Sequence, residues 1–126
     1  MRSFAMAAVL AVIIVISGII SSVKIDSVAS KLYSDADILY THLKENDSSK
    51  AKASLDSAEE VFKKHKVLLE ATSNHEEILR IELSYGHVRE FIENDQMGDA
   101  LASCNEIKHL IKHLPSNFKL KAENIL

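Results

Sequence analysis

The chain has 126 residues, a formal net charge of −3 at pH 7 and hydrophobic residues at 47% of its positions. This acidic balance argues against a nucleic acid partner, because proteins usually meet nucleic acid with a basic patch. The sequence has three Gly and one Pro and shows neither strand alternation nor a Gly-rich loop, which excludes Rossmann, P-loop and barrel enzymes.

The first element is an uncharged run from Phe4 to Val23. As a helix, these twenty residues rise about 30 Å, which is the thickness of the hydrocarbon core of a bilayer. A cleaved signal peptide has a shorter apolar core of roughly 7–15 residues, and cleavage after Ser21 or Ser22 would lack the preferred small residue three positions back. We therefore expect a retained membrane anchor over residues 1–23 and a helical domain over residues 24–126, with a cleaved signal as the weaker alternative.

The orientation of this anchor is read from its flanks. Arg2 precedes the run and Lys24 and Lys31 follow it, so the count of basic residues does not separate the two sides. A three-residue tail before an apolar run is nevertheless typical of a signal-anchor, which translocates the downstream domain. We expect a single-pass protein of the cytoplasmic membrane whose C-terminal domain lies outside.

Apolar residues recur at steps of three and four along the rest of the chain, which is the pattern of helices with one buried face. The first helix is expected to run unbroken from Phe4 to Lys44, because no proline precedes Pro115. Polar breaks at 45–49, 73–74 and 93–96 separate three further helices. Pro115 is expected to end the fourth helix, and the tail after it is expected to form a short helix of its own.

Two of the breaks resemble each other at a spacing near fifty residues. Glu45-Asn46-Asp47 and Glu93-Asn94-Asp95 each precede an alanine-bearing helix, and the second copy has one extra residue. The predicted fold class is therefore all-α: an N-terminal transmembrane helix that continues into an antiparallel four-helix bundle of two αα-hairpins. A tetratricopeptide-like arrangement of the hairpins stays open, although the aromatic and glycine positions of that repeat's first helix are missing.

Six histidines invite a metal hypothesis. Glu106, His109 and His113 share one face of the fourth helix in a Glu-x-x-His pattern used by carboxylate bundles. Such sites need two of these motifs and two further glutamates, whereas this chain has one motif, and cations near a helix C-terminus also complement the helix dipole. We therefore expect no metal and no cofactor, and these three residues remain minor metal candidates.

Three other features have a structural and a functional interpretation. His65 lies in the apolar register of the second helix, as a core histidine bonded to a Tyr or carboxylate would, and a catalytic base there has no evident nucleophile partner. His75 opens the third helix beside acids that complement the dipole. The basic cluster Lys63–Lys66 is a solvated face, unless the second helix returns to anionic headgroups. Cys104 is expected in the core.

With these elements placed, nearly the whole chain resembles the bacterial domain-of-unknown-function family 4363. The resemblance rests on the run Phe4–Val23, the stretch Asn74–Ile78, the sequence His113-Leu114-Pro115, and the closing Leu120 with Asn124-Ile125-Leu126. It implies an anchored helical domain outside the cytoplasmic membrane and a multi-pass membrane protein as a partner. It brings no established activity, cofactor or catalytic residues.

The expected function is that of a non-enzymatic interaction module that docks a membrane or envelope protein. The alternative is an envelope sensor that binds a metal or another ligand through its surface histidines, and a third is a hydrolase built around His65 or His75. The identity of the partner, the process served and the oligomeric state stay open.

Overall fold

The computed structural model describes the backbone of residues 2–125 and the side chains of residues 2–17 and 24–114. Over this range the chain forms four helices: α1 (Arg2–Lys44), α2 (Ser48–Thr72), α3 (His75–Glu93) and α4 (Met97–Ile125). The predicted all-α class and the three predicted breaks between helices are confirmed.

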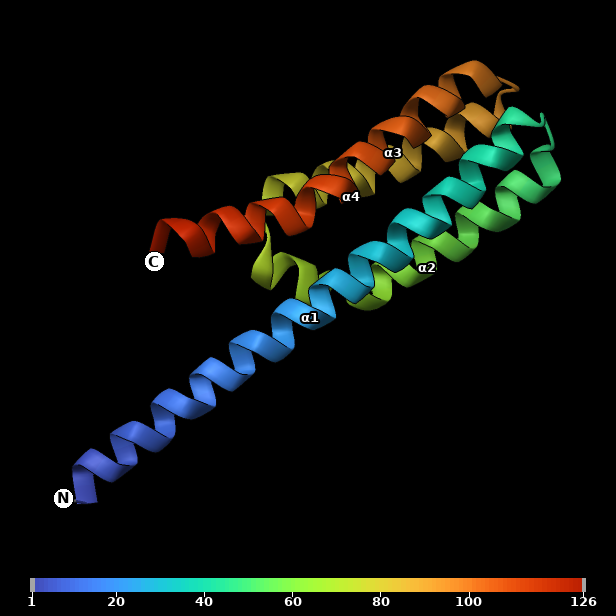
Figure 1. Ribbon diagram of the computed structural model, residues 1–126. Coiled ribbons are helices and arrows are strands. Elements are labelled where there is room, and N and C mark those ends of the chain that lie inside the picture. The colour runs from blue at the N-terminus through green and yellow to red at the C-terminus, as the bar shows by residue number, and fades with distance from the viewer. Residues whose placement is uncertain (1, 126) are drawn as a thin grey trace.

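The helices form an antiparallel ring (Figure 1). α1 packs against α2 and α4, and α3 also packs against α2 and α4, whereas α1 and α3 share no comparable interface within the described residues. A tetratricopeptide-like stack would place the first helices of successive hairpins, α1 and α3, against each other. The arrangement is therefore the four-helix bundle rather than the repeat-type stack.

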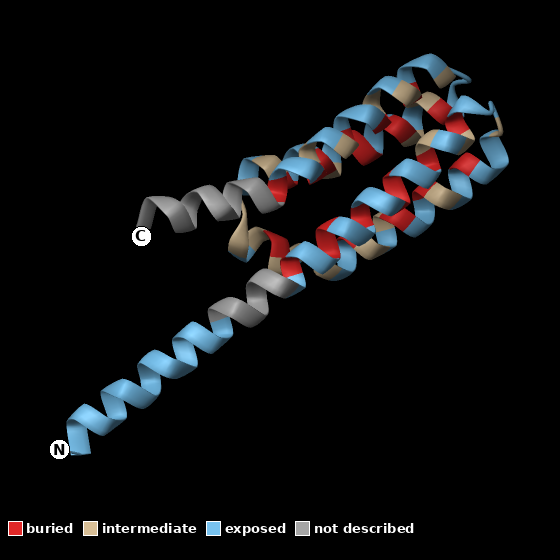
Figure 2. Cartoon of the chain, in the orientation of Figure 1, coloured by how far each residue is buried: buried red, intermediate tan, exposed pale blue. Residues whose placement is uncertain are grey.

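One apolar face of each helix points into the bundle, as the buried stripes in Figure 2 show. Fully burying a Leu, Ile or Phe side chain contributes roughly 1.5–3 kcal/mol relative to leaving it exposed, so this core holds the ring together. The buried core comprises Val28, Ala29, Leu32, Ala36, Leu39, Leu43, Ala51, Leu55, Ala58, Phe62, Leu69, Ile78, Ile81, Tyr85, Val88, Ile92, Ala100, Cys104, Ile107, Ile111 and Leu114.

The turns after α1 and α3 have the same backbone structure. Asn46 and Asp95, 49 positions apart, both adopt a left-handed conformation with φ of 58° and 56°. The next residue of each turn, Asp47 or Gln96, donates its backbone N–H back to the carbonyl of His42 or Phe91. These are matching Schellman ends. The internal repeat therefore aligns without the extra residue that the sequence comparison predicts.

The end of α4 corrects one prediction. Pro115 does not terminate the helix, and α4 continues to Ile125 rather than giving way to a separate short helix. A proline removes one backbone hydrogen bond and crowds the preceding turn, but a helix often continues across it when the turns on both sides are favourable.

The N-terminal arm of α1, residues 2–17, lies outside the bundle (Figure 1). Every residue of this arm is exposed, including Phe4, Leu10 and Ile14 (Figure 2). Among the described residues, no helix has a stretch long and apolar enough to cross a membrane. The predicted anchor extends to Val23, and the side chains of 18–23 lie outside the described residues.

Candidate functional site

α1 and α4 separate toward the end of the bundle from which the arm leaves (Figure 1). Two adjoining cavities lie between them and share Tyr33 and Lys112. We call the two together the α1/α4 groove. Its walls come from Asp26, Ala29, Ser30 and Tyr33 on α1 and from Asn105, Lys108, His109, Ile111 and Lys112 on α4.

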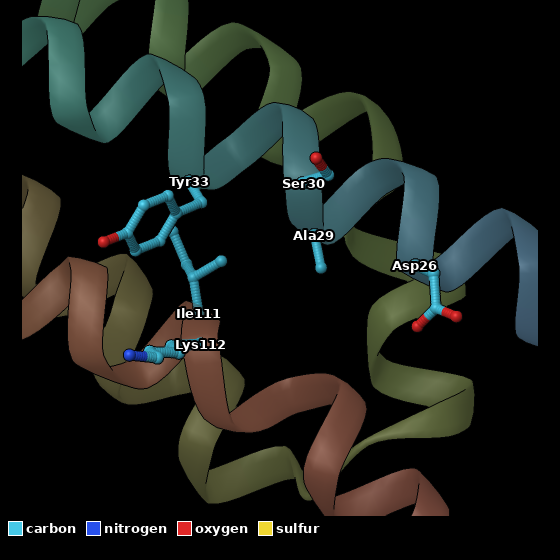
Figure 3. A pocket seen from close by; sticks show the side chains of 6 residues that line it. All are labelled: Asp26, Ala29, Ser30, Tyr33, Ile111 and Lys112. Carbon is cyan, nitrogen blue, oxygen red and sulfur yellow. The ribbon is translucent and has the colours of Figure 1, made fainter.

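The cavity nearer the arm is the larger, at about 440 Å³. Figure 3 shows Tyr33 and Ile111 approaching each other from opposite helices, with Ala29 on the same wall as Tyr33. Asp26 stands at the edge nearest the arm and Lys112 on the facing helix. This half of the groove therefore has an apolar floor with one acid and one base at its margins, and we call it the apolar half.

The second cavity, of about 200 Å³, is lined by side chains that can all donate hydrogen bonds. These are the Tyr33 hydroxyl, the Asn105 amide, the Lys108 and Lys112 ammonium groups and the His109 imidazole. None of the described residues that line it is a carboxylate, and the nearby Asp37 is paired with Lys108. We call this the donor half.

Lys108 is fixed in place by contacts with α1. Its Nζ lies 2.8 Å from Asp37 Oδ1, 4.7 Å from the ring centroid of Tyr40 and 5.5 Å from that of Tyr33. The hydrogen bond to Asp37 raises the pKa of Lys108, so the ammonium group stays charged. The ion pair and the two aromatic rings hold α4 against α1 beside the donor half.

Comparisons with known proteins identify the family. The model of a domain of unknown function, DUF4363, matches residues 19–125. The chain belongs to this family. The resemblance stated from the sequence is thus confirmed. No curated protein and no solved structure matches the chain.

The predicted metal candidates of this DUF4363 protein do not form a cluster. Glu106, His109 and His113 are all exposed on α4, and among them His109 alone lines the groove. Within the described side chains, no group of three or more His, Cys, Asp or Glu residues is arranged to hold a metal ion.

The two histidines considered as catalytic bases lie on α2 and at the start of α3, and neither is among the described residues that line the groove. His65 is half-buried and makes no hydrogen bond within the described residues, so its predicted Tyr or carboxylate partner is not found. His75 is exposed, with Nδ1 3.8 Å from Glu70 Oε1 at the turn between α2 and α3. Neither histidine has a nucleophile beside it in the contacts that the structure describes.

Buried polar groups occupy one level of the DUF4363 bundle interior. Asp35 is 7% exposed; its Oδ1 accepts from Lys31 Nζ at 2.9 Å, while its Oδ2 has no hydrogen-bond partner among the described residues. Burial, with a contribution from Asp35, raises the pKa of Tyr85, whose hydroxyl also finds no hydrogen-bond partner in the part of the chain that the structure describes. Cys104 donates to the carbonyl of Ala36 at 3.3 Å, and burial raises its pKa to about 12, which makes it an unreactive core thiol as predicted.

The groove residues Tyr33, Lys108 and Lys112 are absent from the candidates that the sequence predicts. The available signal was the pair Tyr33 and Tyr40, which are seven positions apart and therefore lie on one face of a helix. That pattern does not show which cation packs against the rings, because the partner lies on another helix, 68 or more positions further along the chain.

Proposed function

We propose that this DUF4363 protein is a single-pass, membrane-anchored interaction module whose helical bundle stands outside the cytoplasmic membrane and docks an envelope or membrane protein. The observation that carries the proposal is the arm of α1, an apolar helix of which every residue from 2 to 17 is exposed. Exposed apolar surface of this extent marks a site of contact with lipid or protein.

The arm is suited to a bilayer rather than to a protein groove. Its apolar side chains are exposed on all sides of the helix, for example Leu10, Val12, Ile13 and Ile14, which are consecutive or nearly so. A helix that is apolar all round requires an apolar medium all round, whereas a protein groove covers one face. In sequence the uncharged run continues to Val23, which is long enough to span.

Docking is proposed for the outer face of the α2/α3 hairpin, on the opposite side of the ring from the α1/α4 groove. Lys66 Nζ and Glu82 Oε2 bridge the two helices at 2.9 Å. Beside this bridge Leu79 and Leu83, one turn apart on α3, are 45% and 54% exposed, and Val67 on α2 is 81% exposed. We call these three residues the hairpin patch.

The turn between α2 and α3 lies at the end of the bundle where the arm leaves (Figure 1), and all three residues of the hairpin patch are within ten residues of this turn in the sequence. A patch so placed faces proteins that rise only a short distance above the membrane. A multi-pass membrane protein with short external loops is therefore the kind of partner that it fits.

Site-specific photocrosslinking tests the docking proposal in living cells. A photoreactive phenylalanine at Leu83 should give a discrete adduct with a membrane protein, whereas the same residue at Lys52, exposed on α2 outside the hairpin patch, should not. The adduct should be lost in Leu79→Asp and kept in Lys52→Asp. Equal adducts from both positions, or an adduct insensitive to Leu79→Asp, would contradict the proposal.

A further inference from the structure

The α1/α4 groove brings two chemistries together in two adjoining hollows. The apolar half offers Ala29, Ile111 and the ring of Tyr33, and the donor half offers hydrogen-bond donors, with no carboxylate among the lining residues that the structure describes. Tyr33 and Lys112 belong to both halves, so a single ligand can contact both. A ligand that matches the groove has an apolar chain at one end and an anionic group at the other.

The charges set the direction in which such a ligand lies. Asp26 is at the edge of the apolar half and would repel an anion there. The charge of Lys108 is balanced by Asp37, whereas Lys112 makes no ion pair within the described residues and so brings an unneutralised positive charge to the donor half. The anionic group therefore belongs in the donor half, away from the arm, and the apolar chain belongs toward the arm.

The position of the groove matches this direction. The apolar half begins at Asp26, two residues beyond Lys24, where the uncharged run has just ended. The donor half lies further from the arm, because α4 runs antiparallel to α1 and its lining residues Asn105 and His109 precede Ile111. A lipid that leaves the bilayer with its headgroup in front would lie in this way. Its headgroup would be in the donor half, further from the membrane, and its acyl chain in the apolar half, nearer to the membrane.

The size of the groove suits a single chain with a headgroup better than it suits a helix. A helix with side chains is about 10–12 Å across and needs a wide groove along its whole length, whereas the two open halves of the groove measure about 440 and 200 Å³. These volumes fall around the lower end of the usual range for small-molecule sites, roughly 300–1,000 Å³.

From these observations we infer that the α1/α4 groove binds a phospholipid of the adjacent bilayer, with its phosphate in the donor half and one acyl chain in the apolar half. The inference rests on the proposed membrane attachment for the supply of lipid, and it is independent of docking at the hairpin patch. Binding is noncovalent and needs no cofactor.

The fluorescence of a single introduced tryptophan reports directly whether an acyl chain lies in the groove, because the protein has no tryptophan of its own. Tyr33→Trp keeps an aromatic ring and a hydrogen-bond donor at the junction of the two halves. The matched control is Tyr40→Trp, because Tyr40 is two turns further from the arm and is not among the described residues that line the groove. Each full-length variant is placed in phosphatidylcholine nanodiscs doped with phosphatidylglycerol brominated in its acyl chains. Tyr33 lies nine residues beyond Lys24, about 14 Å along the helix, which is out of reach of chains that stay in the bilayer.

The expected result is quenching of Tyr33→Trp and none of Tyr40→Trp. Adding Lys112→Glu should raise the fraction of brominated lipid needed for half-quenching about tenfold, whereas Lys52→Glu, the same charge change away from the groove, should leave it unchanged. Native mass spectrometry of the chain with its own Tyr33 should show bound phosphatidylglycerol that Lys112→Glu removes, which keeps the test independent of whether the tryptophan variants fold.

Absence of quenching and of bound lipid in protein that comigrates with nanodiscs would overturn this inference alone. Quenching that Lys112→Glu does not weaken would overturn it as well, because the phosphate would then lie elsewhere. Protein that does not comigrate with nanodiscs would contradict the membrane attachment and, with it, the source of the ligand.

Discussion

Tyr85 places a hydroxyl deep inside the bundle, where the residue is 2% exposed and the oxygen has no hydrogen-bond partner within the described residues. Its ring is well placed, at 5.5 Å from the ring of Phe62. The ring therefore stabilises the core, while the hydroxyl opposes folding through its lost hydration.

Tyr85→Phe is accordingly expected to raise the free energy of unfolding by about 1 kcal/mol, because it removes the unpaired hydroxyl and keeps the ring. Urea denaturation of the full-length chain in detergent measures this. A loss of about 1 kcal/mol or more would mean that the hydroxyl reaches Asp35 through a bridging water.

Cys104 is expected to make the free energy of unfolding decrease as the pH becomes alkaline. Burial raises the pKa of its thiol from 9.0 to about 12, so between these values the unfolded chain releases a proton that the folded chain keeps. The contribution of the thiol is fully present below pH 9 and is lost as the pH rises toward 12. Cys104→Ala should lower stability at pH 7 but flatten its decline above pH 9, as thermal melts across this range would record. An equally steep decline in the variant would contradict the assignment.

Lys108 and Lys112 are a matched pair for testing how α1 is held to α4. Lys108 contacts Asp37, Tyr33 and Tyr40 and its side chain is 17% exposed, whereas Lys112 is exposed and makes no ion pair within the described residues. Lys108→Met should lower the free energy of unfolding by about 1 kcal/mol, and Lys112→Met by less than about 0.5 kcal/mol. Equal effects in urea titrations would show that the contacts of Lys108 contribute nothing measurable.

At the scale of the elements, the turns after α1 and α3 each depend on one residue in a left-handed conformation. Asn46 and Asp95 tolerate the left-handed conformation better than other residues with a Cβ, and Gly adopts it without strain. These two turns determine where α1 and α3 end and thereby align both hairpins of the bundle.

Asn46→Gly should therefore leave stability unchanged or raise it by up to about 0.5 kcal/mol, and Asn46→Ala should lower it by about 1 kcal/mol. The same order, Gly above Ala, is expected at Asp95. Thermal unfolding of the four variants tests this, and a variant with Ala as stable as that with Gly would contradict the left-handed turn.

The helices could be predicted because their signals are local: the period of the apolar residues and the polar breaks, one of which holds Asp47, whose side chain caps α2 by accepting from the N–H of Lys50. The prediction that α4 ends at Pro115 was wrong. It counted the one backbone hydrogen bond that a proline removes, whereas the continuation of α4 depends on the residues of the whole helix. The polar partner predicted for His65 failed for a related reason, since register does not tell how near the neighbouring helix comes.

At the scale of the whole molecule, the choice between bundle and repeat stack depended on which helices are neighbours, and this information is not local. The α1/α4 groove could not be predicted for the same reason, because its two walls bring together residues about eighty positions apart in the sequence, such as Tyr33 and Lys112. Position in the ring separates the groove from the hairpin patch, so one protein could hold a lipid on one side and a partner on the other.

The central claim is that the arm of α1 lies in the membrane and the bundle lies outside it. The most direct test labels single cysteines in intact cells with a membrane-impermeant maleimide, in a Cys104→Ala background. Lys52→Cys, on the bundle, should label rapidly, whereas Ile13→Cys, which is also exposed in the structure, should stay unlabelled until detergent is added. Labelling of Ile13→Cys at the rate of Lys52→Cys, or labelling of Lys52→Cys only after lysis, would contradict the account.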